Sequence, residues 1–319
     1  MPLKIHYQPI FDLVSRPRLG RLDVFFNDIE ESDSSRYGVY LWSQNASASL
    51  YPLMQHLEIA LRNAIDKEAR KRFGEYWWDN VGVDKTKNNW NSFKSGVELA
   101  HKNLKKAWVK AEKKKLGLPE TSNLPLTSVV PVFSHDDIVA STDFGTWKSV
   151  LISAYHTSDP VLVKDYLWPS SFSKVFRRYN KFNSSPDRAR EDILNAVNEL
   201  KDYRNRIFHH DCIWVKSKST SSKNAIETIR HKINLIEKLI TSISPGYANA
   251  LDVWGVFSQA RRVCSFHELD LYTNTKPNFK FMDSDIGQIH DHFSSSATLN
   301  KTASFELNGK HLGAYILRP

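Results

Sequence analysis

Leu200-Lys-Asp-Tyr-Arg-Asn-Arg-Ile-Phe-His-His-Asp211 is the stretch around which this 319-residue chain is organised. It holds two arginines, an asparagine and two adjacent histidines within barely two helical turns. The residues before it carry helix-start signals, with Ser185 placed to cap, Pro186 at the first helical position and acidic side chains in the first turns. The sequence therefore predicts a helix that begins at Pro186 and runs into this stretch.

The apolar residues of this helix have the spacing of a buried stripe. Five apolar residues recur at separations of three, four or seven, which is typical of one helical face: Ile193, Val197, Leu200, Ile207 and Phe208. Arg204 falls within the stripe, between Leu200 and Ile207. Because an unpaired buried charge is costly, we expect Arg204 either to pair with an acid or to face a cleft.

Two histidines follow one turn later, at His209 and His210. Histidine has an unperturbed pKa of about 6.5, which puts proton transfer near neutral pH. A fixed arginine and a proton-transfer group are the two tools of metal-free phosphoryl chemistry. On spacing alone a structural role is the commoner one, with Arg204 paired to a core acid and a histidine complementing the helix dipole.

The stretch Arg204-Asn205-Arg206-Ile207-Phe208-His209 resembles the Arg-(polar)-x-x-x-His signature of the HEPN superfamily of ribonucleases. Extended to Ile213, it is similar to a block of Abi-like (abortive infection) proteins. Two further blocks are similar to the N-terminal and middle blocks of that family: 51–65 followed by Tyr76-Trp77-Trp78, and 143–151 followed by Leu167-Trp168-Pro169. The three blocks span residues 38–262 in the right order. Cys212 is a departure, since the family usually has proline there.

The resemblance implies an all-α, HEPN-type helical bundle and a metal-independent endoribonuclease without cofactor. In such enzymes the ribose 2′-hydroxyl attacks the adjacent phosphate and leaves a 2′,3′-cyclic phosphate. Arg204 would hold the phosphoryl oxygens, His209 would move the proton and Asn205 would fix the geometry. His210 also falls within the family's spacing and could share or take over the role of His209.

Sites of this kind are composite, so the resemblance also implies a homodimer that pairs the Arg204 helices of two protomers. It further implies phage defence, or a toxin of the toxin–antitoxin kind that cleaves cellular RNA and halts growth, and that is restrained until a partner protein or a small RNA triggers it. The alternative is a non-catalytic HEPN module that binds RNA or a nucleotide, or that inhibits a toxin, because fold does not fix function. A metal-dependent nuclease fares worst, since the sequence has no clustered Asp/Glu set of the two-metal kind.

The charge of the chain, +9 overall, favours an anionic partner. Residues 264–319 hold five Lys or Arg against six Asp or Glu, a net charge of −1, so the first 263 residues carry +10. With only Cys212 and Cys264, a reducing compartment is expected. The chain has no run of 18 apolar residues and no signal-peptide pattern at its start, so we expect no membrane association and a cytoplasmic location.

The chain is expected to have three segments: a lead-in over 1–45 with one short helix or strand, a helical domain over 46–263 that carries the resemblance to Abi-like proteins, and an appendage of unknown role over 264–319. A core helix over 46–73 should end at Gly74. Within it Glu58 and Arg62 are spaced for an ion pair, with Asn63 beside them. They either support the bundle or line the same cleft as Arg204.

Basic residues gather in two places. A helix with apolar positions from Trp90 to Trp108 carries seven lysines in fourteen residues, namely Lys102, Lys105, Lys106, Lys110, Lys113, Lys114 and Lys115. They form either a solvated face or an RNA contact, since lysine rows bind phosphates without reading sequence. Lys174, Arg177 and Arg178, on a short helix over 167–179, form a second candidate patch.

The remaining segments complete an expected bundle of seven to nine helices without a sheet. The sequence predicts a loop over 116–127, helical character over 136–155, with Trp147 in the core, an amphipathic helix over 225–243 and one helix over 245–262. In the appendage, Asn308-Gly309 between extended flanks predicts a β-hairpin. His290-Asp291-His292 has two of the side chains of a metal site but no clear third ligand, so no metal is expected.

Overall fold

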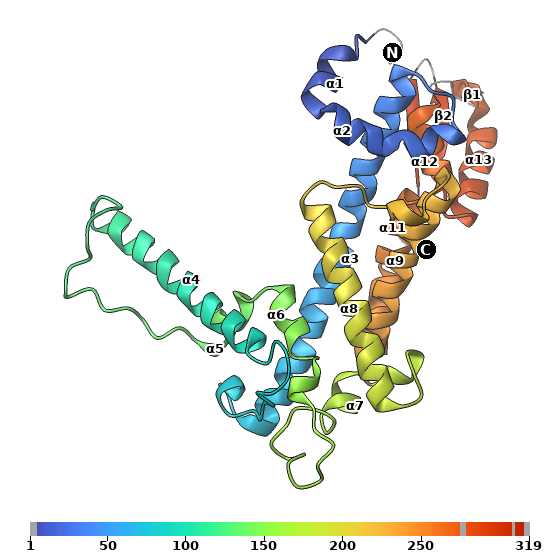
Figure 1. The fold of residues 1–319 in the computed structure, drawn as a ribbon. Coiled ribbons are helices and arrows are strands. Elements are labelled where there is room, and N and C mark those ends of the chain that lie inside the picture. The colour runs from blue at the N-terminus through green and yellow to red at the C-terminus, as the bar shows by residue number, and fades with distance from the viewer. Residues whose placement is uncertain (1–4, 275–278, 308–309, 316–319) are drawn as a thin grey trace. The chain divides into compact units, whose positions relative to one another are not determined.

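The computed structural model describes residues 5–274, 279–307 and 310–315 (Figure 1). It is mostly helical, with one small sheet near the C-terminal end, as the sequence predicts. The chain forms two compact units. We call Met1–Leu57 with Asp202–Pro319 the terminal unit, and Glu58–Lys201 the central unit. The boundaries fall within two long helices, α3 (Asp33–Phe73) and α8 (Pro186–Phe208), so each helix contributes to both units.

The N-terminal residues are far more helical than the sequence predicts. α1 (Gln8–Val14), α2 (Arg16–Leu19) and the 3-10 helix η2 (Gly20–Asn27) precede α3, which begins at Asp33. The polar run before α3 is a helix cap: Ser35 N donates to Ser32 Oγ at 3.1 Å, and Ser32 N donates to Ser35 Oγ at 2.8 Å. The prediction of one short helix or strand over 1–45 is therefore wrong, because a capping sequence has the composition of a linker.

α3 runs 41 residues and ends before Gly74, whose φ of 89° is the left-handed conformation of a helix stop. This confirms the predicted end of the helix. The predicted start at residue 46 is 13 residues late, since the buried stripe continues upstream through Val39 and Trp42.

The central unit is built from α4 (Ser92–Lys115), α5 (His135–Ala140), α6 (Phe144–Ser149) and α7 (Phe172–Val175), with 3-10 helices η3 (Trp77–Asp79), η4 (Ser153–Tyr155) and η5 (Tyr179–Lys181). Its core includes Trp77 stacked on Phe93 at 4.8 Å and Trp147, which is buried as predicted. Helical character over 136–155 is interrupted, because the Asp143 side chain caps a new helix by accepting from Thr146 N. The helix expected over 167–179 is only α7, and Arg177 and Arg178 lie in the turn after it.

α4 projects from the central unit with its C-terminal half clear of α5 and α6 (Figure 1). Residues 116–134, which contain no helix or strand, lead back from its tip and confirm the predicted loop. The lysines of α4 therefore occupy an exposed arm.

The terminal unit continues after α8 with η6 (Lys216–Lys218), α9 (Ser222–Ile243), α10 (Pro245–Val253), α11 (Val256–Val263) and α12 (Phe266–Thr273). The apolar face of α9 is buried as predicted, with Ile229, Ile233, Ile236, Leu239 and Ile240 fully inaccessible. The single helix expected over 245–262 is two helices, because Gly255 takes a left-handed φ of 73° between them.

The C-terminal segment contains β1 (Lys280–Phe281), η7 (Asp283–Asp285), α13 (Ile286–Thr298), β2 (Ala303–Leu307) and β3 (Lys310–Ala314). β2 and β3 are antiparallel with Leu307 opposite Lys310, which confirms the hairpin; its turn residues, Asn308 and Gly309, lie outside the described residues. β1 adds a parallel strand that the sequence did not predict. His292 is structural: its ring centroid lies 4.2 Å from that of Phe279, and its Nε2 contacts Ser304 O at 3.2 Å.

Both cysteines are buried and unpaired. Burial raises the pKa of the Cys264 thiol to about 12, which makes it a poor nucleophile at neutral pH. Within the described ranges, no helix combines the length and apolar content needed to cross a bilayer.

Candidate functional site

α8 ends in a backbone-bonded turn that positions both histidines. Asp211 N donates to Arg206 O at 2.9 Å and His210 N donates to Ile207 O at 3.1 Å, the paired bonds of a Schellman motif. His210 takes the left-handed position with φ 54°, where glycine is usual. α8 therefore ends at Phe208, and both histidines lie in the turn that follows it.

Arg204 lies on α8, one turn before the helix ends at Phe208, and is half-buried. Its Cζ is 4.1 Å from the centroid of the Phe208 ring, a cation–π contact, and its Nε is buried with no hydrogen-bond partner. No carboxylate of the described residues pairs with it. Of the two expectations for Arg204, pairing with a core acid is not observed.

The apolar stripe of α8 is buried as predicted at Ile193, Val197, Leu200 and Ile207, but not at Phe208, which is 40% exposed. Tyr203 is buried in its place. The Phe208 ring touches Tyr51 of α3, 47% exposed, with ring centroids 5.2 Å apart. Arg204 thus lies over Phe208, and Phe208 contacts Tyr51 with the two rings tilted by 45°, so the three side chains form a cluster that is partly open to solvent.

Tyr203 takes no part in proton transfer at neutral pH. Burial raises the pKa of its hydroxyl well above the ordinary value of 10.0, and this hydroxyl has no hydrogen-bond partner. The ring also lies under the Lys232 ammonium group, at 5.5 Å. The residue is a core side chain.

Asp211 ties the turn to the N-terminal helices. It forms an ion pair with Arg21 of η2, and its Oδ2 is 3.6 Å from Arg206 Nε. Its Oδ1 also accepts from Cys212 N at 2.8 Å, a bond that a proline at position 212 could not make.

Asn205 and the two histidines differ in exposure. Asn205 is half-buried and its carbonyl accepts from His209 N at 2.9 Å, whereas both imidazoles are exposed. Nothing in the part of the chain that the structure describes hydrogen-bonds to the His210 ring. His210, and not His209, lines a cavity beside the turn.

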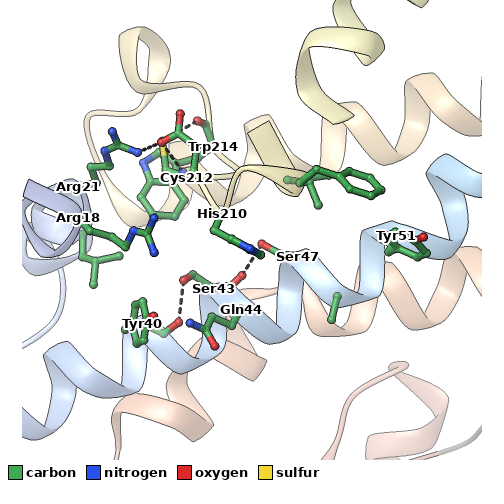
Figure 2. Close-up of a pocket in the computed structure, with 15 residues that line it drawn as sticks. Arg18, Arg21, Tyr40, Ser43, Gln44, Ser47, Tyr51, His210, Cys212 and Trp214 are labelled. Carbon is green, nitrogen blue, oxygen red and sulfur yellow. Dashed lines mark hydrogen bonds and ion pairs between the residues drawn. The ribbon is translucent and has the colours of Figure 1, made fainter. Parts of the chain in front are cut away.

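This cavity, which we call the α3–α8 cavity, has a volume of about 770 Å³ and belongs wholly to the terminal unit (Figure 2). One wall is α3, and another is the end of α8 with the following turn. The N-terminal helices supply two arginines. Its lining residues are Arg18, Arg21, Leu22, Tyr40, Ser43, Gln44, Ser47, Ala48, Tyr51, Ile207, Phe208, His210, Asp211, Cys212 and Trp214.

The polar groups of the cavity are mostly oxygen acceptors and cations. Ser43 Oγ donates to Tyr40 O at 2.7 Å and Ser47 Oγ donates to Ser43 O at 2.8 Å, so both hydroxyl protons are used and their lone pairs face outward. Figure 2 shows His210 pointing from the turn toward these serines. Arg18, exposed on α2, has no acidic partner among the described residues.

The other predicted site residues lie in the central unit. Glu58, Arg62 and Asn63 are on α3, where Arg62 Nε donates weakly to Asn63 Oδ1 at 3.4 Å. A shared cleft with Arg204 stays a prediction.

Five lysines of α4, Lys102, Lys105, Lys106, Lys110 and Lys113, line a groove of about 540 Å³ together with Val109 and Glu120. Glu120 is engaged by two of them: Lys110 Nζ is 3.1 Å from its carboxylate, and Lys113 Nζ donates to its carbonyl at 2.6 Å. Arg177 and Arg178 are exposed. The structure therefore assembles most of the predicted lysine row on one face.

Sequence reasoning missed the cavity residues Arg18, Arg21 and the polar face of α3. A signal was present: Tyr40, Ser43, Gln44, Ser47 and Tyr51 recur at helical spacing, on a face beside the buried stripe of α3. Because the segment before residue 46 has the composition of a lead-in, this second stripe was overlooked.

No family model matches the chain, and neither the curated proteins nor the solved structures contain one that is significantly similar to it.

Proposed function

We propose that this protein is a metal-independent endoribonuclease of the HEPN type, acting in the cytoplasm in phage defence or as a growth-halting toxin. The proposal starts from the resemblance of three blocks to Abi-like proteins. It is supported by one observation above all: Arg204 is a half-buried cation with no acid partner in the described chain, stacked beside a turn that carries two free histidines.

The free state of Arg204 favours an anionic ligand. Holding a guanidinium partly out of water with its Nε unsatisfied costs free energy, and a phosphate that bonds it would recover that cost. A purely structural arginine at a helix end would instead be expected to meet a carboxylate. The stack on Phe208 also fixes the plane of the guanidinium, as two-point binding of phosphoryl oxygens requires.

In the proposed reaction, the ribose 2′-oxygen attacks the adjacent phosphorus and the bond from phosphorus to O5′ breaks. One histidine takes the proton of the 2′-hydroxyl, and the departing O5′ takes a proton from the imidazolium so formed or from the second histidine in its protonated form. The products are a 2′,3′-cyclic phosphate and a 5′-hydroxyl. Arg204 stabilises the charge that develops on the nonbridging oxygens, and Asn205 orients the reacting groups.

The geometry favours His210 over His209 as the group nearest to bound RNA, because His210 lines the α3–α8 cavity. The resemblance maps first onto His209. Both are kept in the proposal, and single variants at each position separate their roles.

The partners follow from the same proposal. The lysines of the α4 arm, with Arg177 and Arg178, would contact the RNA backbone, and two protomers would pair their Arg204 helices in a homodimer. The activity would be restrained until a partner protein or a small RNA triggers it.

The test is cleavage of total RNA and tRNA by the purified protein in EDTA, with end-group analysis, beside Arg204→Ala, His209→Ala and His210→Ala. Arg206→Ala serves as the matched arginine control, since Arg206 is committed to Asp211. The proposal of an enzyme is supported if cleavage persists in EDTA and leaves a cyclic phosphate. Cleavage should also be lost in Arg204→Ala and retained in Arg206→Ala. An activity that survives in Arg204→Ala overturns it, and RNA binding without cleavage favours the non-catalytic module.

A further inference from the structure

We infer that the α3–α8 cavity binds one nucleotide of a single RNA strand, its base against Tyr51 and Phe208 and its phosphate between Arg18 and His210. The inference deepens the proposed function and rests on it for the identity of the ligand as RNA. None of the cavity residues outside the motif belongs to the predicted site.

The size of the cavity fits a ligand of this class. Its volume of about 770 Å³ lies within the range of roughly 300–1,000 Å³ that is usual for small-molecule sites. It is deep enough to enclose one base and its sugar, and too small for a duplex.

The cations of the cavity favour an anionic ligand. Its lining carries Arg18 and Arg21 against a single carboxylate, Asp211, and that carboxylate is already paired with Arg21. Arg18 is therefore left uncompensated within the described chain. The His210 imidazole, which can donate, opens on the same space. Two donors of this type converging on one space are typical of phosphate recognition.

The aromatic wall suits a base. Tyr51 and Phe208 line the cavity with rings that are 47% and 40% exposed, and exposed rings beside cations are the usual platform for stacked bases. The Arg204 guanidinium lies over the Phe208 ring of this wall, with its Cζ 4.1 Å from the ring centroid. A nucleotide stacked here would thus have its neighbouring phosphate close to the proposed catalytic arginine.

The α3 wall suits the sugar and the base edge. Ser43 and Ser47 present acceptor lone pairs, and the exposed Gln44 amide offers both a donor and an acceptor. A ribose 2′-hydroxyl can donate to such acceptors, which a deoxyribose cannot. The cavity is expected to prefer RNA over DNA.

The experiment measures binding in the full chain carrying Arg204→Ala, so that cleavage does not consume the ligand. The probes are a short fluorescein-labelled single-stranded RNA, the DNA of the same sequence, and adenosine and uridine monophosphates. Two changes target the cavity: Arg18→Ala removes the free cation, and Ala48→Trp fills the space from a position on its α3 wall. Arg16→Ala is the matched control, an exposed arginine of the same helix that does not line the cavity.

We expect Arg18→Ala and Ala48→Trp each to weaken RNA binding by about tenfold or more, and Arg16→Ala to leave it within about twofold, since removal of a charge-assisted hydrogen bond has an effect of this size. The NMR signal of the His210 ring, identified with His210→Gln, should shift on adding RNA. Equal binding by all variants, or a silent His210, overturns the inference. If the monophosphates bind tightly in the cavity and RNA does not displace them, the inference of an RNA strand is overturned, and the ligand of the cavity is a free nucleotide. Each result holds whether or not the wild type cleaves.

Discussion

The guanidinium carbon of Arg204 lies 4.1 Å from the centre of the Phe208 ring, so the proposed catalytic arginine is oriented by an aromatic side chain one helical turn further along α8. No other side chain of the described residues holds it by a hydrogen bond. Its direction therefore depends on Phe208.

Phe208→Ala should lower the rate of RNA cleavage, while the free energy of unfolding changes little. Removal of a partly exposed cation–π interaction corresponds to about 0.5–1 kcal/mol, or roughly two- to fivefold in kcat. Because Phe208 is 40% exposed, the free energy of unfolding should fall by less than in a core truncation. Single-turnover kinetics and urea unfolding measure the two effects. Phe266→Ala, a 47% exposed phenylalanine on α12, is the control; an equal loss of activity there would remove the argument.

His210→Gly should stabilise the fold and abolish or strongly reduce the activity. Position 210 has φ 54°, and an L-residue in this conformation loses about 1 kcal/mol relative to glycine. The gain should be visible as a higher midpoint in urea. His209→Gly, one residue earlier and outside the left-handed region, should show no such gain. A destabilised His210→Gly would mean that the imidazole contributes stabilising interactions of its own.

Gly38→Ala should be strongly destabilising. A Cβ at position 38 of α3 would collide with the carbonyl of Tyr272 in α12, and backbone cannot move aside cheaply. Overpacking of this kind costs about 1–3 kcal/mol. Gly246→Ala, near the start of α10, meets nothing within 4 Å and should be neutral or slightly stabilising. Thermal or urea unfolding of both variants decides; a tolerated Gly38→Ala would contradict the close packing of α12 on α3.

Stability should fall as the pH drops through 6.5, partly because of His56. Burial lowers the pKa of His56 below its ordinary 6.5, so the unfolded chain binds this proton more readily than the folded chain. The free energy of unfolding is then lost between pH 6.5 and the lower folded-state pKa. His56→Gln should flatten this part of the profile.

Tyr247→Phe is the matched test for His56. It removes the hydroxyl that lies 2.6 Å from His56 Nδ1 but keeps the ring that covers it. Because burial is the cause of the shift, the pH dependence should persist in this variant. If it disappears with the hydroxyl, the hydrogen bond sets the pKa.

Removal of Lys102 and Lys106 should weaken RNA binding in a salt-dependent way. Both line the groove on α4, and for a single strand each lysine that no longer neutralises a phosphate should reduce the slope of log affinity against log salt by about 0.7. Lys94→Ala is the control, since Lys94 of the same helix is paired with Asp79 at 3.0 Å. An unchanged slope of log affinity against log salt in the double variant would mean that these lysines form a solvated face and do not contact RNA.

The helices with strongly periodic apolar residues could be predicted from the sequence, but the breaks between neighbouring helices could not. The buried faces of α8 and α9 and the stop at Gly74 follow from local pattern alone. The break at Gly255 and the new helix at Asp143 depend on one backbone angle and one side-chain cap, which composition does not reveal. The start of α3 was hidden because serines that cap a helix also occur in linkers.

The motif residues of the candidate site could be predicted from the sequence, but the cavity residues from other helices could not. Arg204, Asn205 and the histidines are adjacent in sequence, so their meeting needs only one helix end. Arg18, Arg21 and the Tyr40–Tyr51 face come from other helices, and their approach to His210 depends on tertiary packing. Which histidine faces the cavity was decided by a left-handed turn that no side-chain pattern encodes.

Both hydrogen bonds that shape the turn after α8 run between backbone atoms, from His210 N to Ile207 O and from Asp211 N to Arg206 O. The path of the chain through the motif is therefore independent of the side chains at Arg204, Asn205 and His209. Alanine at any of these positions should leave the neighbouring groups where they are. Each such variant then reports chemistry alone, and the motif can be dissected one functional group at a time without refolding the site.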